Sequence, residues 1–131
     1  MKIFLDTADV SLIEQYYGTG LIDGVTTNPT LIKKSGYDPE EVYRKIALIG
    51  VDDISMEIVT DDSYEFLKEG RRLKEKFGEI TTIKVPCTPE GLKACKLLSK
   101  EGIRVNVTLI FSAAQAVLAS KAGAAYVSPF V

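Results

Sequence analysis

Short apolar stretches alternate with amphipathic segments along this chain. The apolar stretches predict strands over residues 3–6, 21–28, 54–59, 80–85, 104–110 and 125–131. The amphipathic segments predict helices over 11–17, 38–49, 61–78, 88–102 and 112–123, several of them opened by capping residues such as Ser11 with Glu14, Thr88 and Ser112 with Gln115. Strands that alternate with helices indicate an α/β chain with a parallel sheet.

Two architectures fit this order: an open doubly wound sheet and a (β/α)8 TIM-type barrel. Polar residues favour the barrel, because one recurs near the carboxyl end of each predicted strand, 20 to 29 residues apart. They are Asp6, Asn28, Glu57, Lys84, Asn106 with Thr108, and Ser128. In a barrel these side chains converge at the mouth, where active sites lie. We therefore expect an incomplete barrel of about six βα units, forming a single domain over residues 1–131.

Alternation within one strand separates its apolar and polar side chains. Side chains point to opposite faces in turn, so Val105, Val107 and Leu109 are expected on one face and Asn106 and Thr108 on the other. By the same rule, Lys84 is expected on the face opposite to Ile83 and Val85. Glu57 is likewise expected on the face opposite to Met56 and Ile58.

Lys84 is the residue with the clearest chemical meaning. It interrupts an apolar strand, and lysines are seldom buried without an ion-pair partner or a chemical function. Burial disfavours the charged form of a lysine, and the neutral amine attacks carbonyl groups. The residues thus indicate a Schiff-base site in which Glu57 and Asp6 transfer protons, Thr108 holds a water, and Asn28 and Asn106 bind sugar hydroxyls.

Each of these residues also has an ordinary structural alternative. Lys84 could lie on an exposed strand face, Asp6 could cap a turn, and Asn28 or Ser128 could serve the turn that the following proline makes. Glu57 could be an exposed strand residue, and Asn106 and Thr108 could make ordinary hydrogen bonds within the sheet. The functional interpretation is favoured because a polar residue recurs at the same place, near the carboxyl end, in every predicted strand.

Composition narrows the chemistry further. The 131 residues carry a net charge of −2 and no histidine, which argues against a nucleic-acid surface, a metal site and histidine catalysis. We expect no cofactor and no membrane association. The two cysteines, Cys87 and Cys95, lack CxxC spacing and no secretory signal is evident, so a reduced, cytoplasmic setting is expected.

Six sequence motifs together resemble the transaldolase family, in its small branch close to fructose-6-phosphate aldolase, over the whole chain. They are FLDTA at 4–8, GVTTNPT at 24–30, IKVP at 83–86, GLKA at 91–94, VNVTLIFS at 105–112 and SPFV at 128–131. The resemblance implies a (β/α)8 barrel that transfers a dihydroxyacetone unit from a ketose phosphate, sedoheptulose 7-phosphate or fructose 6-phosphate, to an aldose phosphate in the pentose phosphate pathway.

The resemblance also implies residue roles. Lys84 is the Schiff-base lysine, Asp6 takes the proton from the donor hydroxyl, and Glu57 and Thr108 hold the water that relays protons. The implied substrate-binding residues are Thr26, Asn28, Asn106, Ser128 and Phe130. Glu57 and Phe130 favour transaldolase over the aldolase branch, where glutamine and tyrosine are expected.

The chain departs from the family pattern at its end. The family continues beyond this point with an arginine that binds the substrate phosphate and with two more βα units, so we expect a truncated chain with weak or no activity. Exposed barrel edges are expected to pair with other copies in a homo-oligomer. Two alternatives remain: an aldolase that acts on dihydroxyacetone, and an inactive fragment that assembles with itself.

Overall fold

The structure is a computed structural model that describes residues 1–130, so the last residue of the predicted sixth strand, Val131, lies outside the described residues. The chain forms two compact units. Unit 1 comprises residues 1–57 and 77–81, and unit 2 comprises residues 58–76 together with the described residues from Thr82 onwards. The prediction of a single domain stays a prediction.

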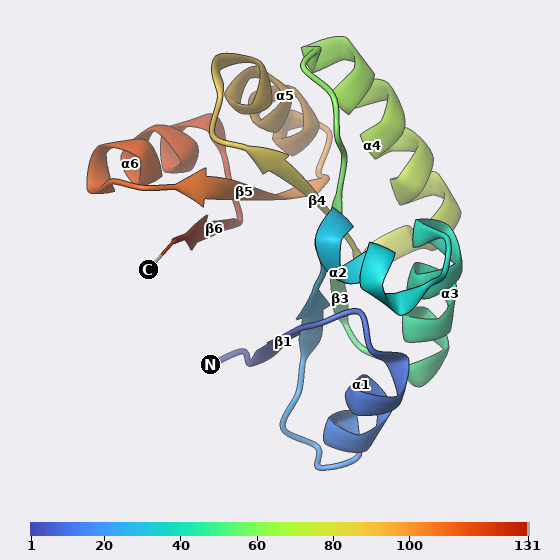
Figure 1. The fold of residues 1–131 in the computed structure, drawn as a ribbon. Helices are drawn as coiled ribbons and strands as arrows, with labels where there is room; N and C mark the ends of the chain where they lie inside the picture. The colour runs from blue at the N-terminus through green and yellow to red at the C-terminus, as the bar shows by residue number, and fades with distance from the viewer. Residues whose placement is uncertain (131) are drawn as a thin grey trace. The chain divides into compact units, whose positions relative to one another are not determined.

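Unit 1 is a three-stranded parallel sheet with helices packed against it (Figure 1). Its elements are β1 (Phe4–Asp6), α1 (Val10–Tyr17), β2 (Gly24–Thr26), α2 (Pro29–Ser35), α3 (Pro39–Ile49), β3 (Asp53–Glu57) and the 3-10 turn η1 (Gly78–Ile80). The core consists of fully buried side chains from α1, α3 and the strands, which are Ile13, Val25, Val42, Ile46, Ile54 and Met56. Their burial supplies most of the stabilising free energy of this unit.

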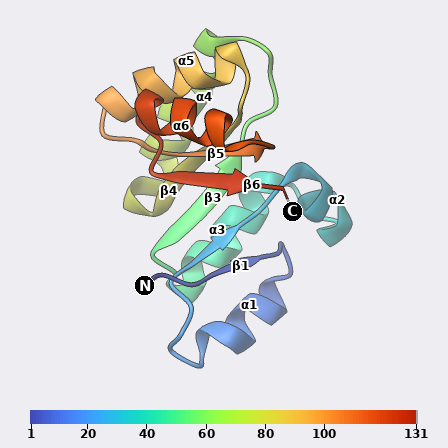
Figure 2. The same cartoon turned by 90° about the vertical axis from the view of Figure 1, so that its left-hand side faces the viewer.

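Unit 2 repeats the same arrangement. Its elements are α4 (Ser63–Phe77, whose last residue belongs to unit 1), β4 (Thr81–Pro86, whose first residue belongs to unit 1), α5 (Pro89–Lys100), β5 (Arg104–Ile110), α6 (Ala113–Ala122) and β6 (Tyr126–Pro129). β4, β5 and β6 are parallel neighbours, and β5 and β6 run side by side in the same direction in Figure 2. The core of unit 2 includes the fully buried side chains of Phe66, Ile83, Leu98 and Val105.

The strand order within each unit follows the chain order, β1–β2–β3 and β4–β5–β6. In a doubly wound sheet the order of the strands reverses at a switch point. In a barrel each new strand is added beside the previous one, always on the same side. The predicted α/β class of barrel type is therefore confirmed, with six parallel strands and alternating helices over residues 1–130.

Glycine at position 91 holds the first turn of α5 close to the end of β4. A Cβ atom placed there would lie 2.0 Å from the Pro86 carbonyl oxygen, which no real side chain tolerates. Thr88 caps the same helix as predicted, because its hydroxyl accepts a 3.0 Å hydrogen bond from the Gly91 N–H. The strand that carries Lys84 is thus followed by a tightly fixed turn.

The beginning of the first predicted helix needs correction. We expected Ser11 and Glu14 to form the cap, but α1 begins at Val10, and the Asp9 side chain accepts the hydrogen bond from the Leu12 N–H at 3.1 Å. Asp9 and Ser11 are both good N-cap residues, so the sequence pattern alone did not separate them.

A second correction concerns the residues after β2. The predicted strand over 21–28 shrinks to Gly24–Thr26, and an unpredicted short helix, α2, follows from Pro29. Asn28 caps α2 and Pro29 occupies its first position, which is the favoured place for proline in a helix. The sequence analysis treated Asn28-Pro29 as a strand end and missed this helix.

The third correction lies in β5, where the predicted alternation fails at Leu109. Its φ of 59° is left-handed, a rare conformation for a leucine. Thr108 pairs with Ser128 but Ile110 pairs with Pro129, so two steps along β5 oppose one step along β6. This is a β-bulge with Leu109 as its extra residue. Leu109 is 41% exposed and does not join the buried Val105 and Val107 as we expected.

Candidate active site

Lys84 is buried, as the sequence predicted. The residue is only 7% exposed, and its strand neighbours Ile83 and Val85 are fully buried on the opposite face of β4. This burial removes the alternative that Lys84 lies on an exposed strand face.

Asn106 lies directly across from Lys84 in the parallel register of β4 and β5. It is 2% exposed and accepts a 2.8 Å hydrogen bond through its Oδ1 atom from the Ser128 hydroxyl. Tyr126 of β6 continues the same row. Lys84 therefore lies beside the neutral amide of Asn106 on the adjacent strand, and Ser128 orients that amide.

The next row along this face contains Thr108. It pairs with Pro86 on one side and with Ser128 on the other, and it is 6% exposed. Because residues two apart on a strand share a face, Thr108 lies on the same face as Asn106. Unit 2 thus brings together four predicted site residues from three adjacent strands, namely Lys84, Asn106, Thr108 and Ser128.

Phe130 follows β6 and stacks on a second ring, that of Phe111. The ring centroids are 5.2 Å apart and the planes differ by 19°. Sequence analysis named Phe130 as a substrate-binding residue and gave Phe111 no role in the site. The bulge at Leu109 is the reason, because it shifts the phase of every later residue by one, and no pattern in the sequence announced it.

Unit 1 carries the remaining predicted site residues. Asp6 ends β1 and pairs in register with Thr26 at the end of β2. The Thr26 hydroxyl donates a 2.9 Å hydrogen bond to Asp6 Oδ1, so the two side chains lie on the same face of the sheet. Asp6 is exposed, which suits a carboxylate that exchanges protons with a bound molecule.

Glu57 ends β3 and is half-buried. Its charge acts on Tyr43 of α3, a residue that is only 3% exposed. Burial raises the pKa of Tyr43 to about 12, and the negative charge of Glu57 adds to that rise, against a hydrogen bond with Thr27 that lowers it. Glu57 is thus partly withdrawn from solvent beside the apolar core of unit 1.

Asn28 has a structural function that the sequence analysis did not predict, because the alternative considered there was a turn residue and the structure shows a helix cap. Its Oδ1 atom accepts a 2.9 Å hydrogen bond from the Leu31 N–H and caps α2. The cap uses one acceptor position of the amide oxygen, so a substrate contact could come from the NH2 group or from the second lone pair of the oxygen. The predicted substrate-binding role stays a prediction.

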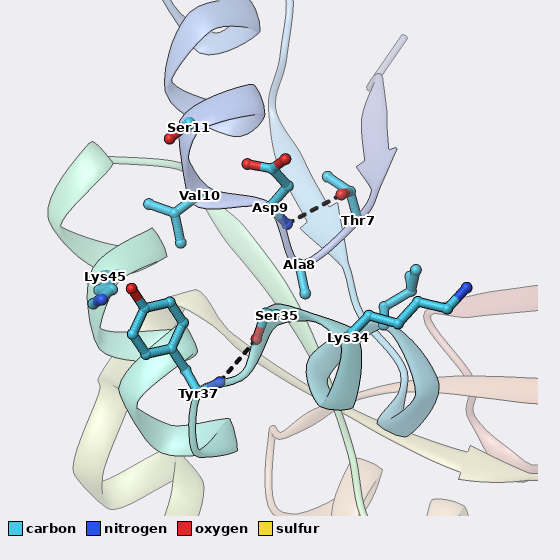
Figure 3. A pocket seen from close by; sticks show the side chains of 10 residues that line it. Thr7, Ala8, Asp9, Val10, Ser11, Lys34, Ser35, Tyr37 and Lys45 are labelled. Atoms are coloured by element: carbon cyan, nitrogen blue, oxygen red, sulfur yellow. Dashed lines mark hydrogen bonds between the residues drawn. The ribbon is translucent and has the colours of Figure 1, made fainter.

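A polar pocket of about 550 Å³ lies in unit 1 next to β1 (Figure 3). It is lined by the residues that follow Asp6, by part of α2 and by Lys45 of α3, and Asp6 itself does not line it. Some of its polar groups interact with one another: the Asp9 N–H donates to the Thr7 hydroxyl, and Lys45 lies 3.5 Å from the Tyr37 ring centre. The pocket is therefore separate from the predicted site residues.

Residues 1–130 contain no group of His, Cys, Asp or Glu side chains able to hold a metal ion. Among the same residues, no helix is both long and apolar enough to cross a membrane.

Comparison with known proteins identifies the class. The six parallel strands and the helices between them are those of a barrel-type α/β chain, and a family model described as Transaldolase/Fructose-6-phosphate aldolase matches residues 3–131. The chain belongs to this family.

Curated relatives agree with the family assignment. A protein named "Probable transaldolase" from Methanococcus maripaludis (strain S2) is 56% identical over 131 residues, which are 100% of this chain and 60% of the relative. Proteins of the same name from Nitrosopumilus maritimus and Geobacter metallireducens are 51% and 55% identical, again over all of this chain and over 59% and 61% of their own lengths. The chain therefore spans about three-fifths of the length of these relatives.

Proposed function

We propose that this chain carries the Schiff-base chemistry of a class I transaldolase, with Lys84 as the nucleophile. The observation that carries the proposal is the buried position of Lys84, in register with Asn106 and on the same face as Thr108. The neutral amine of a lysine attacks ketones, and the amide of Asn106 and the hydroxyl of Thr108 are groups that can hydrogen-bond to a sugar.

The first proposed step is imine formation. The neutral amine of Lys84 adds to the carbonyl carbon of a ketose phosphate, and the carbonyl oxygen leaves as water once it has been protonated. Glu57 and Thr108 hold the water through which these protons move. Histidine, the usual residue for such transfers, is absent from the sequence.

The second proposed step is cleavage of the carbon–carbon bond. The Asp6 carboxylate takes the proton of the donor hydroxyl, the bond breaks with release of an aldose phosphate, and the electron pair moves into the imine to form an enamine. The Thr26 hydroxyl holds the Asp6 carboxylate in place through their hydrogen bond. The enamine then adds to the aldehyde of an acceptor aldose phosphate, and hydrolysis frees Lys84.

Substrate binding is proposed for five residues in all. Asn28, Asn106 and Ser128 bind hydroxyl groups of the sugar, Thr26 positions Asp6 beside it, and Phe130 provides an apolar wall. No cofactor is proposed.

The branch of the family can be tested by product analysis with fructose 6-phosphate. A transaldolase retains the three-carbon unit until an aldose phosphate acceptor is added, whereas an aldolase releases free dihydroxyacetone without one. Glu57 and Phe130 favour the first outcome. Release of dihydroxyacetone at the full rate without acceptor would instead assign the chain to the aldolase branch.

We further propose self-association in a cytoplasmic setting. Both cysteines are free, which fits a reducing compartment. Apolar side chains of α6 are exposed, with Val117 at 66% and Leu118 at 53%, and unpartnered apolar surface of this kind favours contact with a second copy. Sedimentation analysis should find oligomers that dissociate when both residues are changed to lysine. A parent chain that sediments as a monomer would overturn the proposal.

A further inference from the structure

The bulge at Leu109 determines which face of β5 receives Phe111. Without it, alternation would place Phe111 on the face of Val105 and Val107, away from Asn106 and Thr108. With one residue inserted, Ile110 takes the buried position opposite Pro129 and is 2% exposed. Phe111, one residue further, moves to the face that carries Asn106 and Thr108.

The contacts of Phe130 also place Phe111 on this face of the sheet. Phe130 lies two residues beyond Ser128 and so continues the face of Ser128. Its N–H donates a 3.0 Å hydrogen bond to the Ile110 carbonyl, and its ring stacks on Phe111 at 5.2 Å. The polar face of unit 2 therefore ends in an aromatic pair, one row beyond Thr108 and Ser128.

This aromatic pair is unusually exposed. Phe111 is 67% exposed and Phe130 is 60% exposed. Paired exposed phenyl rings add little to the stability of a fold, and contiguous apolar surface beside buried polar groups marks a binding site. A short polyhydroxy ketone has an apolar side formed by its C–H groups, which can pack on a ring while its hydroxyl groups bind Asn106 and Ser128.

We infer that Phe111 is a further substrate-contacting residue of this site, and that Leu109 is a positioning residue whose left-handed backbone places it there. The inference rests on the proposed Schiff-base function. Phe111 and Phe130 form one wall that contacts the carbon chain of the ketone and keeps water away from the imine on Lys84. The left-handed conformation of a leucine is unfavourable, and the substrate-facing position of Phe111 explains why it is retained.

The test measures how fast dihydroxyacetone labels Lys84. The ketone and the amine form an imine with loss of water, borohydride reduces that imine to a stable secondary amine, and peptide mass spectrometry quantifies it. Rates are measured over a range of dihydroxyacetone concentrations, so that the half-saturating concentration and the maximal rate are obtained separately.

Phe111→Ala is expected to raise the half-saturating concentration at least about tenfold, with a smaller change in the maximal rate, because a contact with the ground-state ligand is lost. Phe111→Leu keeps apolar bulk and should recover part of the loss. Tyr64→Ala is the matched control, because Tyr64 is an aromatic residue of the same unit with the same 67% exposure, outside the proposed site. It should label like the parent chain.

Two changes at Leu109 test the positioning role. Leu109→Gly should label like the parent, because glycine adopts a φ near 59° without strain. Leu109→Val should lose labelling, because a β-branched residue disfavours that conformation and returns Phe111 to the other face. Thermal unfolding confirms that each variant is folded. Should Leu109→Val not fold, Leu109→Gly and Phe111→Ala still decide the matter.

The outcomes separate the inference from the proposed function. Labelling of the parent that is unchanged in folded Phe111→Ala would overturn the role of Phe111 and leave the function standing. Lost labelling in folded Leu109→Gly would show that the leucine side chain, not the bulge, matters. A parent chain that is never labelled at Lys84 would overturn the function and this inference together.

Discussion

The Ser128 hydroxyl donates a 2.8 Å hydrogen bond to the Asn106 side-chain oxygen, across the strands β5 and β6. Because the oxygen of the amide accepts this hydrogen bond, Ser128 orients the amide plane and directs the NH2 group of Asn106 away from Ser128. Asn106 also lies in register with Lys84. Ser128 therefore determines which end of the Asn106 amide is presented to a molecule bound at Lys84.

Removing this hydrogen bond should affect stability and labelling together. Ser128→Ala is expected to lower the free energy of unfolding by about 1 kcal/mol, the usual net contribution of such a bond. It should also slow labelling of Lys84 by dihydroxyacetone and borohydride severalfold, since Asn106 can then turn. Ser120→Ala, on the exposed face of α6, is the matched control and should change neither quantity. Unchanged labelling of Lys84 in Ser128→Ala would show that Asn106 does not depend on Ser128 for its role.

Lys84 should be required for adduct formation. Lys84→Met keeps the length of the side chain and removes the amine, so we expect no borohydride adduct at this position in a folded chain. Denaturant unfolding checks that the variant is folded. Lys96→Met, at an exposed position on α5, should be labelled like the parent. A folded Lys84→Met chain that is labelled as strongly as the parent would contradict the assignment of Lys84 as the nucleophile.

Asp6 should matter for bond cleavage but not for imine formation. Asp6→Asn cannot take the donor hydroxyl proton, so cleavage of fructose 6-phosphate is expected to fall by about 100-fold or more. Labelling by dihydroxyacetone, which needs no carbon–carbon cleavage, should persist. Asp9→Asn removes a nearby carboxylate and keeps a good helix cap, so it should cleave like the parent. Equal losses of cleavage and labelling in Asp6→Asn would contradict the assigned role.

Alkaline pH should destabilise unit 1 through Tyr43. Burial raises the pKa of Tyr43 to about 12 from 10.0, so the unfolded chain releases this proton first. The contribution of Tyr43 to the free energy of unfolding is fully present below pH 10. It is lost as the pH rises to 12, and the total loss is about 2 to 3 kcal/mol. Denaturant unfolding at several pH values in this range measures the loss.

Tyr43→Phe separates this effect from that of Cys95. Burial also raises the pKa of the Cys95 thiol, to about 11 from 9.0, so stability from that group is lost over an overlapping range. In Tyr43→Phe, the free energy of unfolding should fall less steeply between pH 10 and 12. The fall that remains is the one caused by Cys95. An identical pH profile in the variant would refute the assignment to Tyr43.

The sequence predicted the α/β class and the buried position of Lys84 because both follow from local patterns. Helix caps at Thr88 and Ser112 were also predicted, since they depend on residues within one turn. The short helix α2 was missed because seven residues carry too little periodicity to recognise.

The bulge at Leu109 could not be predicted from the pattern. VNVTLIF alternates in a way that fits a regular strand, and only the pairing of β5 with β6 reveals the inserted residue. Phe111 was therefore assigned no role, although it stacks on the predicted residue Phe130. The roles of Asp6, Glu57 and Asn28 also go beyond local pattern, because they depend on a bound substrate.

Borohydride trapping tests the central claim most directly. The chain is incubated with dihydroxyacetone and, separately, with fructose 6-phosphate, then reduced and mapped by peptide mass spectrometry. We predict an adduct on Lys84 and on no other lysine with dihydroxyacetone, and a weaker one with the phosphorylated sugar. A folded chain that shows no adduct on Lys84 with either compound would contradict the assignment of Lys84 as the nucleophile.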